Sequence, residues 1–99
     1  MTEALELPPV LDLVAAAALH EALTGRRGTD LAMDAAGVQR LGAQCLQVLL
    51  AARAAWAADG MILAVENLSG EFAAALELMG VMPGDLTHHP QQNDKELAA

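Results

Sequence analysis

The sequence is poor in hydroxyl groups, aromatic rings, cysteine and positive charge. Its 99 residues include one cysteine, one tryptophan, one phenylalanine and no tyrosine, and five Lys and Arg oppose thirteen Asp and Glu, for a formal net charge of −8. The lone Cys45 excludes an internal disulfide and favours a reducing compartment. The acidic balance and the scarcity of rings argue against nucleic-acid binding and against docking on an anionic membrane surface.

Long apolar runs are also missing. No stretch reaches the roughly 18 uninterrupted apolar residues of a membrane-spanning helix, and the start MTEALELPP has neither the cationic nor the apolar part of a signal peptide. We therefore expect a cytoplasmic protein with no direct membrane insertion.

What is present is enough apolar material for one small domain, since 55% of the residues are hydrophobic. We place this domain over residues 1–84. The following segment, which includes HHPQQNDKELAA, has little to bury, so residues 85–99 are predicted to form a flexible acidic tail.

The apolar pattern predicts strands and helices in alternation. Strands are expected over 4–7, 30–35 and 61–65, and helices after Asp12 as N-cap, over 41–59 and over 68–79 with Asn67 or Ser69 as cap. Continuous apolar strands separated by helices are typical of parallel sheets. The fold class predicted is therefore α/β, a small sandwich with a mostly parallel sheet of three or four strands and helices packed on it. Leu13, Ala16, Leu19 and Leu23 are expected to share the buried face of the first helix, and Leu46, Leu49, Leu50 and Trp56 that of the second.

Two residues invite a chemical interpretation. His20 has no His, Cys or carboxylate on its face, so we expect an exposed or satisfied side chain rather than a ligand. Cys45 lies near the start of a helix that follows a strand, where a thiol pKa is lowered in redox enzymes. The alternative is a buried free cysteine among Leu41, Leu49 and Ala52. His88 and His89 lack further metal ligands, and no metal or cofactor site is predicted.

Asp34 and the outer face of the second helix each have two interpretations. Asp34 ends an apolar strand, where it caps the following turn or helps to shape a binding surface. The outer face carries short side chains and few charges, which suits close docking by a partner. Alanine is also the best helix former, so composition alone does not decide between the two. The residues of this face are Gln44, Gln47, Ala51, Ala55 and Ala58.

Three stretches resemble the STAS domain family (sulphate transporter and anti-sigma factor antagonist). They are PPVLDLVAAAALHEAL, DLAMDAAGVQRLGAQCLQVLLAARAAWAADG and MILAVENLSGEFAAALELMGV. The matching motifs are Leu11-Asp12 before the first helix, Met33-Asp34-Ala35 at a strand end, and Leu78-Met79-Gly80 at a helix end. The resemblance spans residues 4–82 and is greatest to the free-standing STAS proteins of bacterial chemotaxis gene clusters. It implies a small α/β domain that binds a signalling histidine kinase.

The chain departs from the family pattern in two ways. STAS domains usually have an extra early strand and often a final one, whereas we see room for only one strand before Asp12, and MPGDLTHHP is a poor strand. The sheet edges are thus expected to be open to a partner or to a second copy, and a homodimer would form through such an edge or through a helix face. Family members that act in a phosphorylation switch carry Ser or Thr after Asp at the start of the second helix. Here Ala43 occupies the phosphoacceptor position and Gly42 that of the Asp.

From these observations we predict a non-enzymatic, anti-sigma-factor-antagonist-like interaction module of bacterial signal transduction. It would bind a chemotaxis-type histidine kinase without its own phosphorylation switch. Two alternatives remain, a soluble STAS subunit of a lipid-transport ABC complex and a single-cysteine redox protein using Cys45. The predicted partner-binding surface comprises Gln39, Arg40, Gly42, Ala43, Gln44, Gln47 and Ala51.

Overall fold

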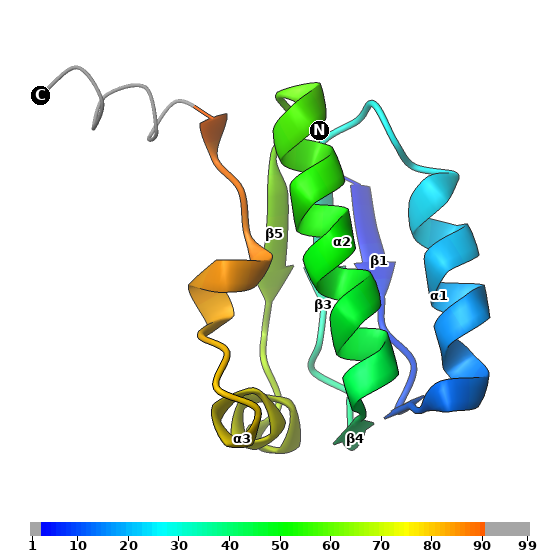
Figure 1. Ribbon diagram of the computed structural model, residues 1–99, viewed down its shortest axis with the longest axis vertical. Helices are drawn as coiled ribbons and strands as arrows, with labels where there is room; N and C mark the ends of the chain where they lie inside the picture. The colour runs from blue at the N-terminus through cyan, green and yellow to red at the C-terminus, as the bar shows by residue number, and fades with distance from the viewer. Residues whose placement is uncertain (1–2, 91–99) are drawn as a thin grey trace, which may run out of the picture.

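The computed structural model describes residues 3–90, which form two parallel sheets and three α-helices (Figure 1). Strands β1 (Glu3–Glu6), β3 (Leu31–Asp34) and β5 (Leu63–Glu66) form the main sheet in the order β1-β3-β5, and all pairs are parallel. The short strands β2 (Val10–Leu11) and β4 (Arg40–Leu41) form a second parallel pair. The α/β class and the mostly parallel sheet are therefore confirmed.

The helices are α1 (Leu13–Thr24), α2 (Ala43–Asp59) and α3 (Gly70–Leu78), followed by a short 3₁₀ helix, η1 (Pro83–Leu86). Figure 1 shows α2 in front of the main sheet and α1 beside it, next to β1, while α3 lies beyond the lower ends of the strands. Both α1 and α2 begin at that lower end, next to the β2–β4 pair. This end of the fold therefore brings together the segments in which the sequence places the partner-binding surface.

Local chemistry explains where the helices begin and end. The Asp12 carboxylate accepts a hydrogen bond from the Ala15 amide at 3.1 Å and so caps α1 as predicted. Of the two candidates for α3 it is Ser69 that caps, because its Oγ accepts from the Phe72 amide at 3.0 Å. Helix α2 ends at Gly60, whose φ of 70° is a left-handed conformation that favours glycine.

The core lies between the main sheet and the helices. Leu31, Met33 and Leu63 come from the sheet and Leu49 and Trp56 from α2, and all are essentially buried. Helix α3 adds Phe72 and Leu76. Two residues predicted to face the core do not, since Leu13 is 70% exposed and Leu50 is 36% exposed.

The expectation of a single strand before Asp12 is wrong, because β2 follows Pro8-Pro9. Val10 and Leu11 pair in register with Arg40 and Leu41. The Pro9 carbonyl also accepts hydrogen bonds from the amides of Gln39 and Arg40, at 2.7 and 3.1 Å. Proline lacks an amide hydrogen but keeps its carbonyl, so the Pro-Pro segment still anchors the returning chain.

The predicted start of the tail at residue 85 is also corrected. Leu86 is fully buried, and His88 is 6% exposed. The His88 backbone forms an antiparallel bridge with Leu63, and its Nδ1 lies 2.8 Å from the Met61 carbonyl. The ordered fold thus continues past residue 84, and the part of the predicted tail from 91 to 99 lies outside the described residues.

Candidate functional site

The start of α2, where Ala43 lies, is exposed and lacks a side-chain cap. Gly42 is the N-cap residue, with extended dihedral angles of −99° and 169° and no side-chain hydrogen bond to the helix. Its amide donates to the Leu11 carbonyl at 2.8 Å, which ties the start of α2 to β2. The first turn of α2 therefore presents backbone donors without a capping oxygen from Gly42, and the Ala43 side chain supplies no hydroxyl.

The structure exposes nearly all of the predicted partner-binding surface. Only Gly42 is half-buried. The hydrogen bonds to Pro9 hold the segment that leads into α2, and the helix then presents its four predicted positions along one side, with Ala51 two turns from the start. The exposed members are Gln39, Arg40, Ala43, Gln44, Gln47 and Ala51.

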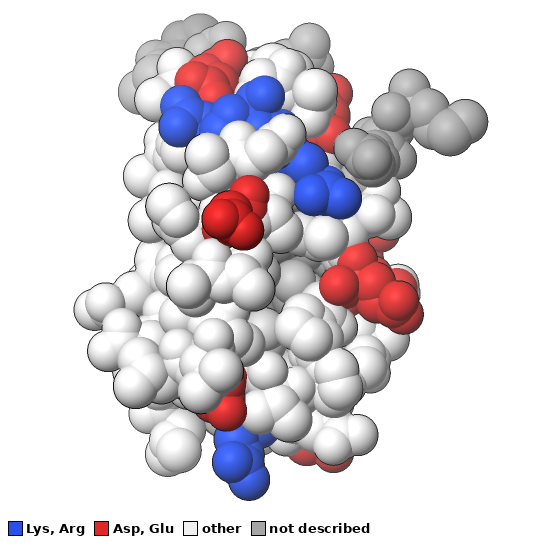
Figure 2. Space-filling view, turned by 90° about the vertical axis from the view of Figure 1, so that its right-hand side faces the viewer, with Lys and Arg blue, Asp and Glu red and all other residues white. Residues whose placement is uncertain are grey.

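Sequence reasoning missed the apolar residues beside this surface. Val10, Leu13 and Val14 are 40%, 70% and 87% exposed, and they come from β2 and the first turn of α1. Figure 2 shows the side of the molecule that carries α1, and its lower half is largely free of charge. The available signal was the composition of α1, which has no charged residue before Glu21 and is thus apolar on more than its inner face.

Cys45 lies in the core at the start of α2. Its side chain is fully buried, and its Sγ donates to the Asp12 carbonyl at 3.2 Å. Burial and, to a lesser extent, the Asp12 carboxylate raise the pKa of the thiol. The thiolate required for redox or nucleophilic chemistry is therefore disfavoured, which favours the alternative of a buried free cysteine.

The polar groups that drew attention in the sequence mostly stabilise turns. The Asp34 carboxylate accepts from the Ala36 amide at 2.9 Å, which confirms its capping role. Ser69 is the one serine of the chain, and its hydroxyl both accepts and donates a hydrogen bond. Its Oγ accepts from the Phe72 amide and donates to the Val38 carbonyl at 2.6 Å. Thr29 donates to the Arg26 carbonyl at 2.8 Å. None of these hydroxyls belongs to the predicted partner-binding surface.

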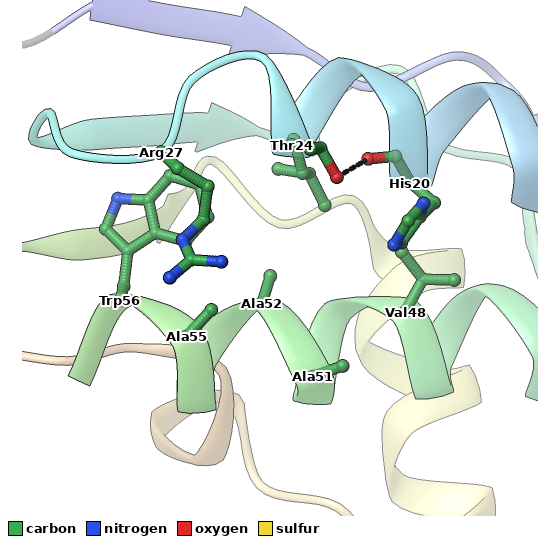
Figure 3. Close-up of a pocket in the computed structure, with 9 residues that line it drawn as sticks. His20, Thr24, Arg27, Val48, Ala51, Ala52, Ala55 and Trp56 are labelled. Atoms are coloured by element: carbon green, nitrogen blue, oxygen red, sulfur yellow. Dashed lines mark hydrogen bonds between the residues drawn. The ribbon is translucent and has the colours of Figure 1, made fainter. Parts of the chain in front are cut away.

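A crevice of about 80 Å³ separates α1 from α2 (Figure 3). His20, Thr24 and Arg27 line it from the α1 side, and Ala51 and Ala55 from α2. The Thr24 hydroxyl donates a hydrogen bond to the His20 carbonyl at 2.8 Å, which the dashed line in Figure 3 marks. The predicted alanine face of α2 is thus only partly an outer surface, because Ala55 is half-buried against this crevice.

The cation in the crevice is already paired. Arg27 forms a bidentate ion pair with Asp59, with Nε–Oδ2 and Nη2–Oδ1 distances of 2.8 and 3.0 Å. The hydrogen bonds with Arg27 lower the pKa of Asp59. His20 is exposed, as expected. Within residues 3–90, no three His, Cys, Asp or Glu side chains are arranged to hold a metal ion, and no helix has the length and apolarity to cross a bilayer.

Comparison with known proteins agrees with this geometry. A protein-family model described as "Mlab, STAS domain" matches residues 2–83, which is most of the chain. The search of curated proteins found no match to this chain. STAS domains generally act as interaction modules rather than as enzymes. Anti-sigma-factor antagonists are one class of protein built on this domain. By this match, and with the α/β fold described above, the chain belongs to the STAS domain family.

Proposed function

We propose that this chain is a cytoplasmic docking module that binds a chemotaxis-type histidine kinase through the start of α2. The observation that carries the proposal is the exposed, hydroxyl-free Ala43, which follows the half-buried Gly42 at the end of the fold that also carries the exposed apolar residues Val10, Leu13 and Val14. A Cβ added to Gly42 would lie 3.5 Å from the Leu11 carbonyl oxygen, so the start of α2 packs closely against the β2–α1 junction.

This surface combines the features of a protein interface. Its centre is apolar and has short side chains, which cost little rotamer entropy when a partner covers them. Arg40, Gln44 and Gln47 are exposed around it and offer hydrogen bonds and one positive charge at the rim. Because Ala43 carries no hydroxyl, binding at this surface is not switched by phosphorylation of residue 43.

The test is a titration of the purified chain with a purified chemotaxis-type histidine kinase. We expect Ala43→Glu to weaken binding by roughly tenfold or more, because it buries a carboxylate in the interface. Ala58→Glu is the matched control, since Ala58 is an exposed residue of α2 near its other end. We expect this variant to bind like the unchanged chain. Equal binding by the Ala43→Glu variant would show that the surface lies elsewhere.

The second candidate is a soluble STAS subunit of a lipid-transport ABC complex, whose STAS domains likewise lack the phosphoacceptor. The missing hydroxyl at Ala43 fits this candidate as well as the first. Titration with the ATPase of such a complex distinguishes the two. Binding to the ATPase and not to the kinase, with the same sensitivity to Ala43→Glu, would favour the transporter.

A further inference from the structure

One edge of the main sheet is open among the described residues. In the order β1-β3-β5, the outer edge of β5 is covered by the bridge from Leu63 to His88. No described strand lies outside β1. The Leu7 amide donates to Asp34 of β3 at 2.9 Å, so the alternation of a strand directs the amides and carbonyls of Ala4 and Glu6 away from β3. These four backbone groups are available to another strand.

An apolar groove runs beside this edge. It has a volume of about 200 Å³ and lies between β1 and α1. Its apolar lining includes Leu5, Leu7, Ala15, Ala18, Leu19 and Ala22, and Glu6 and Pro8 also border it. Leu7 and Leu19 are buried at its base, whereas Ala18 is exposed at its rim. Alternate side chains of a strand added to β1 would face the same side as Leu5 and Leu7 and enter this groove.

The opposite face of the sheet is acidic at the same level. Glu6, Asp34 and Glu66 are paired in register across the three strands, so three carboxylate-bearing residues form one row. Glu6 and Glu66 are exposed. The remaining side chains of an added strand would lie beside Ala4 and Glu6, at the usual cross-strand separation of about 5 Å. Positively charged side chains fit these positions.

We propose that β1 is a docking edge for an extended segment of a partner protein in which apolar residues alternate with basic ones. A strand with this alternation satisfies the open backbone groups, fills the apolar groove and places a positive charge beside Glu6, the outermost residue of the acidic row. The proposal does not depend on the kinase-binding surface, because it uses a different part of the fold.

The two other occupants fit less well. In antiparallel pairing of β1 with a second copy, the outward-facing residues have to oppose each other, so Glu6 would lie opposite Ala4 of that copy and no basic side chain would reach the acidic row. Residues 91–99, QQNDKELAA, contain one lysine and no alternation of apolar and basic residues. The sequence of neither occupant matches both faces of the edge.

The test uses a fluorescein-labelled hexapeptide in which valine alternates with lysine, and measures its binding by fluorescence anisotropy. Control peptides have the same composition with the three valines together, or valine alternating with glutamate. We expect only the alternating basic peptide to bind, with weaker binding as the salt concentration rises. Equal binding of the rearranged peptide would overturn the proposal.

Variants of the chain locate the peptide. Ala4→Pro removes an outward-facing amide without removing a β1–β3 hydrogen bond, and Ala18→Glu places a charge at the groove rim. We expect each to weaken binding roughly tenfold or more. Ala17→Glu is the control for the latter, because Ala17 is exposed on α1 but does not line the groove. Thermal melting followed by Trp56 fluorescence verifies that every variant is folded.

A charge reversal gives the sharpest outcome. Glu6→Lys should lose the basic peptide and bind the valine–glutamate peptide instead, a gain that general loss of structure does not produce. Sedimentation and truncation examine the other occupants. A dimer that Ala4→Pro dissociates, or a roughly tenfold gain in peptide affinity after removal of residues 91–99, would overturn the proposal in favour of a second copy or of the chain's own end.

Discussion

The backbones of Leu63 and His88 are joined by two hydrogen bonds. The Leu63 amide donates to the His88 carbonyl at 3.0 Å, and the His88 amide donates to the Leu63 carbonyl at 2.8 Å. This pair draws the segment after α3 along the outer edge of β5 and places Leu86 in the core. Arg53 of α2 secures the same segment, because its Nε donates to the Thr87 carbonyl at 2.9 Å.

The first prediction concerns this segment. We expect Leu86→Ala to lower the free energy of unfolding by about 2–4 kcal/mol, because it removes a fully buried side chain and leaves a cavity. Leu78→Ala is the control, since Leu78 is 88% exposed, and its effect should stay within about 0.5 kcal/mol. Urea unfolding followed by Trp56 fluorescence measures both. Equal stability of the two variants would show that the segment does not pack as described.

The second prediction concerns the ion pair between the end of α2 and the turn after α1. Because Arg27 lowers the pKa of Asp59 in the folded state, the pair stabilises the fold above the ordinary carboxyl pKa near 3.8. This stabilisation is lost as the pH falls through the lowered pKa. We therefore expect Asp59→Asn to reduce stability at about pH 7 and to reduce it less at about pH 2.

The control for the ion pair is Glu77→Gln, which changes an exposed carboxylate of α3 outside this pair. Urea midpoints at the two pH values provide the comparison. If the urea midpoints of the Asp59→Asn variant and the unchanged chain differ by the same amount at both pH values, the pair does not contribute to the acid dependence of stability.

The third prediction concerns Cys45. Since burial raises the pKa of this thiol, the folded state keeps its proton where the unfolded state has lost it. The contribution of the Cys45 thiol to the free energy of unfolding is therefore fully present below the pKa that this thiol has in the unfolded chain. It declines as the pH rises above about 9. Replacement of Cys45 by alanine should remove this alkaline decline.

Thiol labelling gives a second measurement of the same residue. We expect a disulfide reagent to react with Cys45 in urea and to react only at the rate of opening in the folded chain. Complete labelling within seconds in native buffer would contradict the buried geometry and return the redox hypothesis to consideration.

The sequence predicted the elements that carry their own local signals. Asp12 precedes an apolar helical run, and the buried strand around Met33 is continuously apolar, so both were identifiable without tertiary information. Strand β2 was missed because two residues are too few to show a period. It exists only because Arg40 and Leu41 return to pair with it. Leu86 was missed because one apolar residue among polar ones shows no pattern.

The surface was harder to predict than the core. At 100° per residue, Leu13 lies about 120° from Leu19, at the margin of the apolar stripe, so periodicity alone did not decide its exposure. Ala43 and Gln44 were correctly placed on an exposed surface, since the same period directs Leu46 and Leu49 inward. Whether this surface binds a partner depends on a second molecule, which no periodicity within one chain describes.

The last prediction concerns Gly42, the uncapped start of α2. A Cβ at this position meets the Leu11 carbonyl oxygen at 3.5 Å, an ordinary contact, and its φ of −99° is accessible to any residue. Gly42→Ser should therefore fold without strain and supply the missing cap. We expect a gain in unfolding free energy of a few tenths to about 1 kcal/mol. Gly42→Asp should gain less, because Asp12 is adjacent and the two carboxylates repel.

The same variant separates stability from function. If the proposed partner uses the free amides at the start of α2, a serine that occupies one of them competes with the partner. Gly42→Ser should then melt at a higher temperature but bind the kinase more weakly than the unchanged chain. Gly42→Ala is the control, since it adds a Cβ but no hydrogen-bond acceptor. Equal weakening by both variants would assign the effect to the methyl group, and undiminished binding by Gly42→Ser would show that the partner does not use these amides.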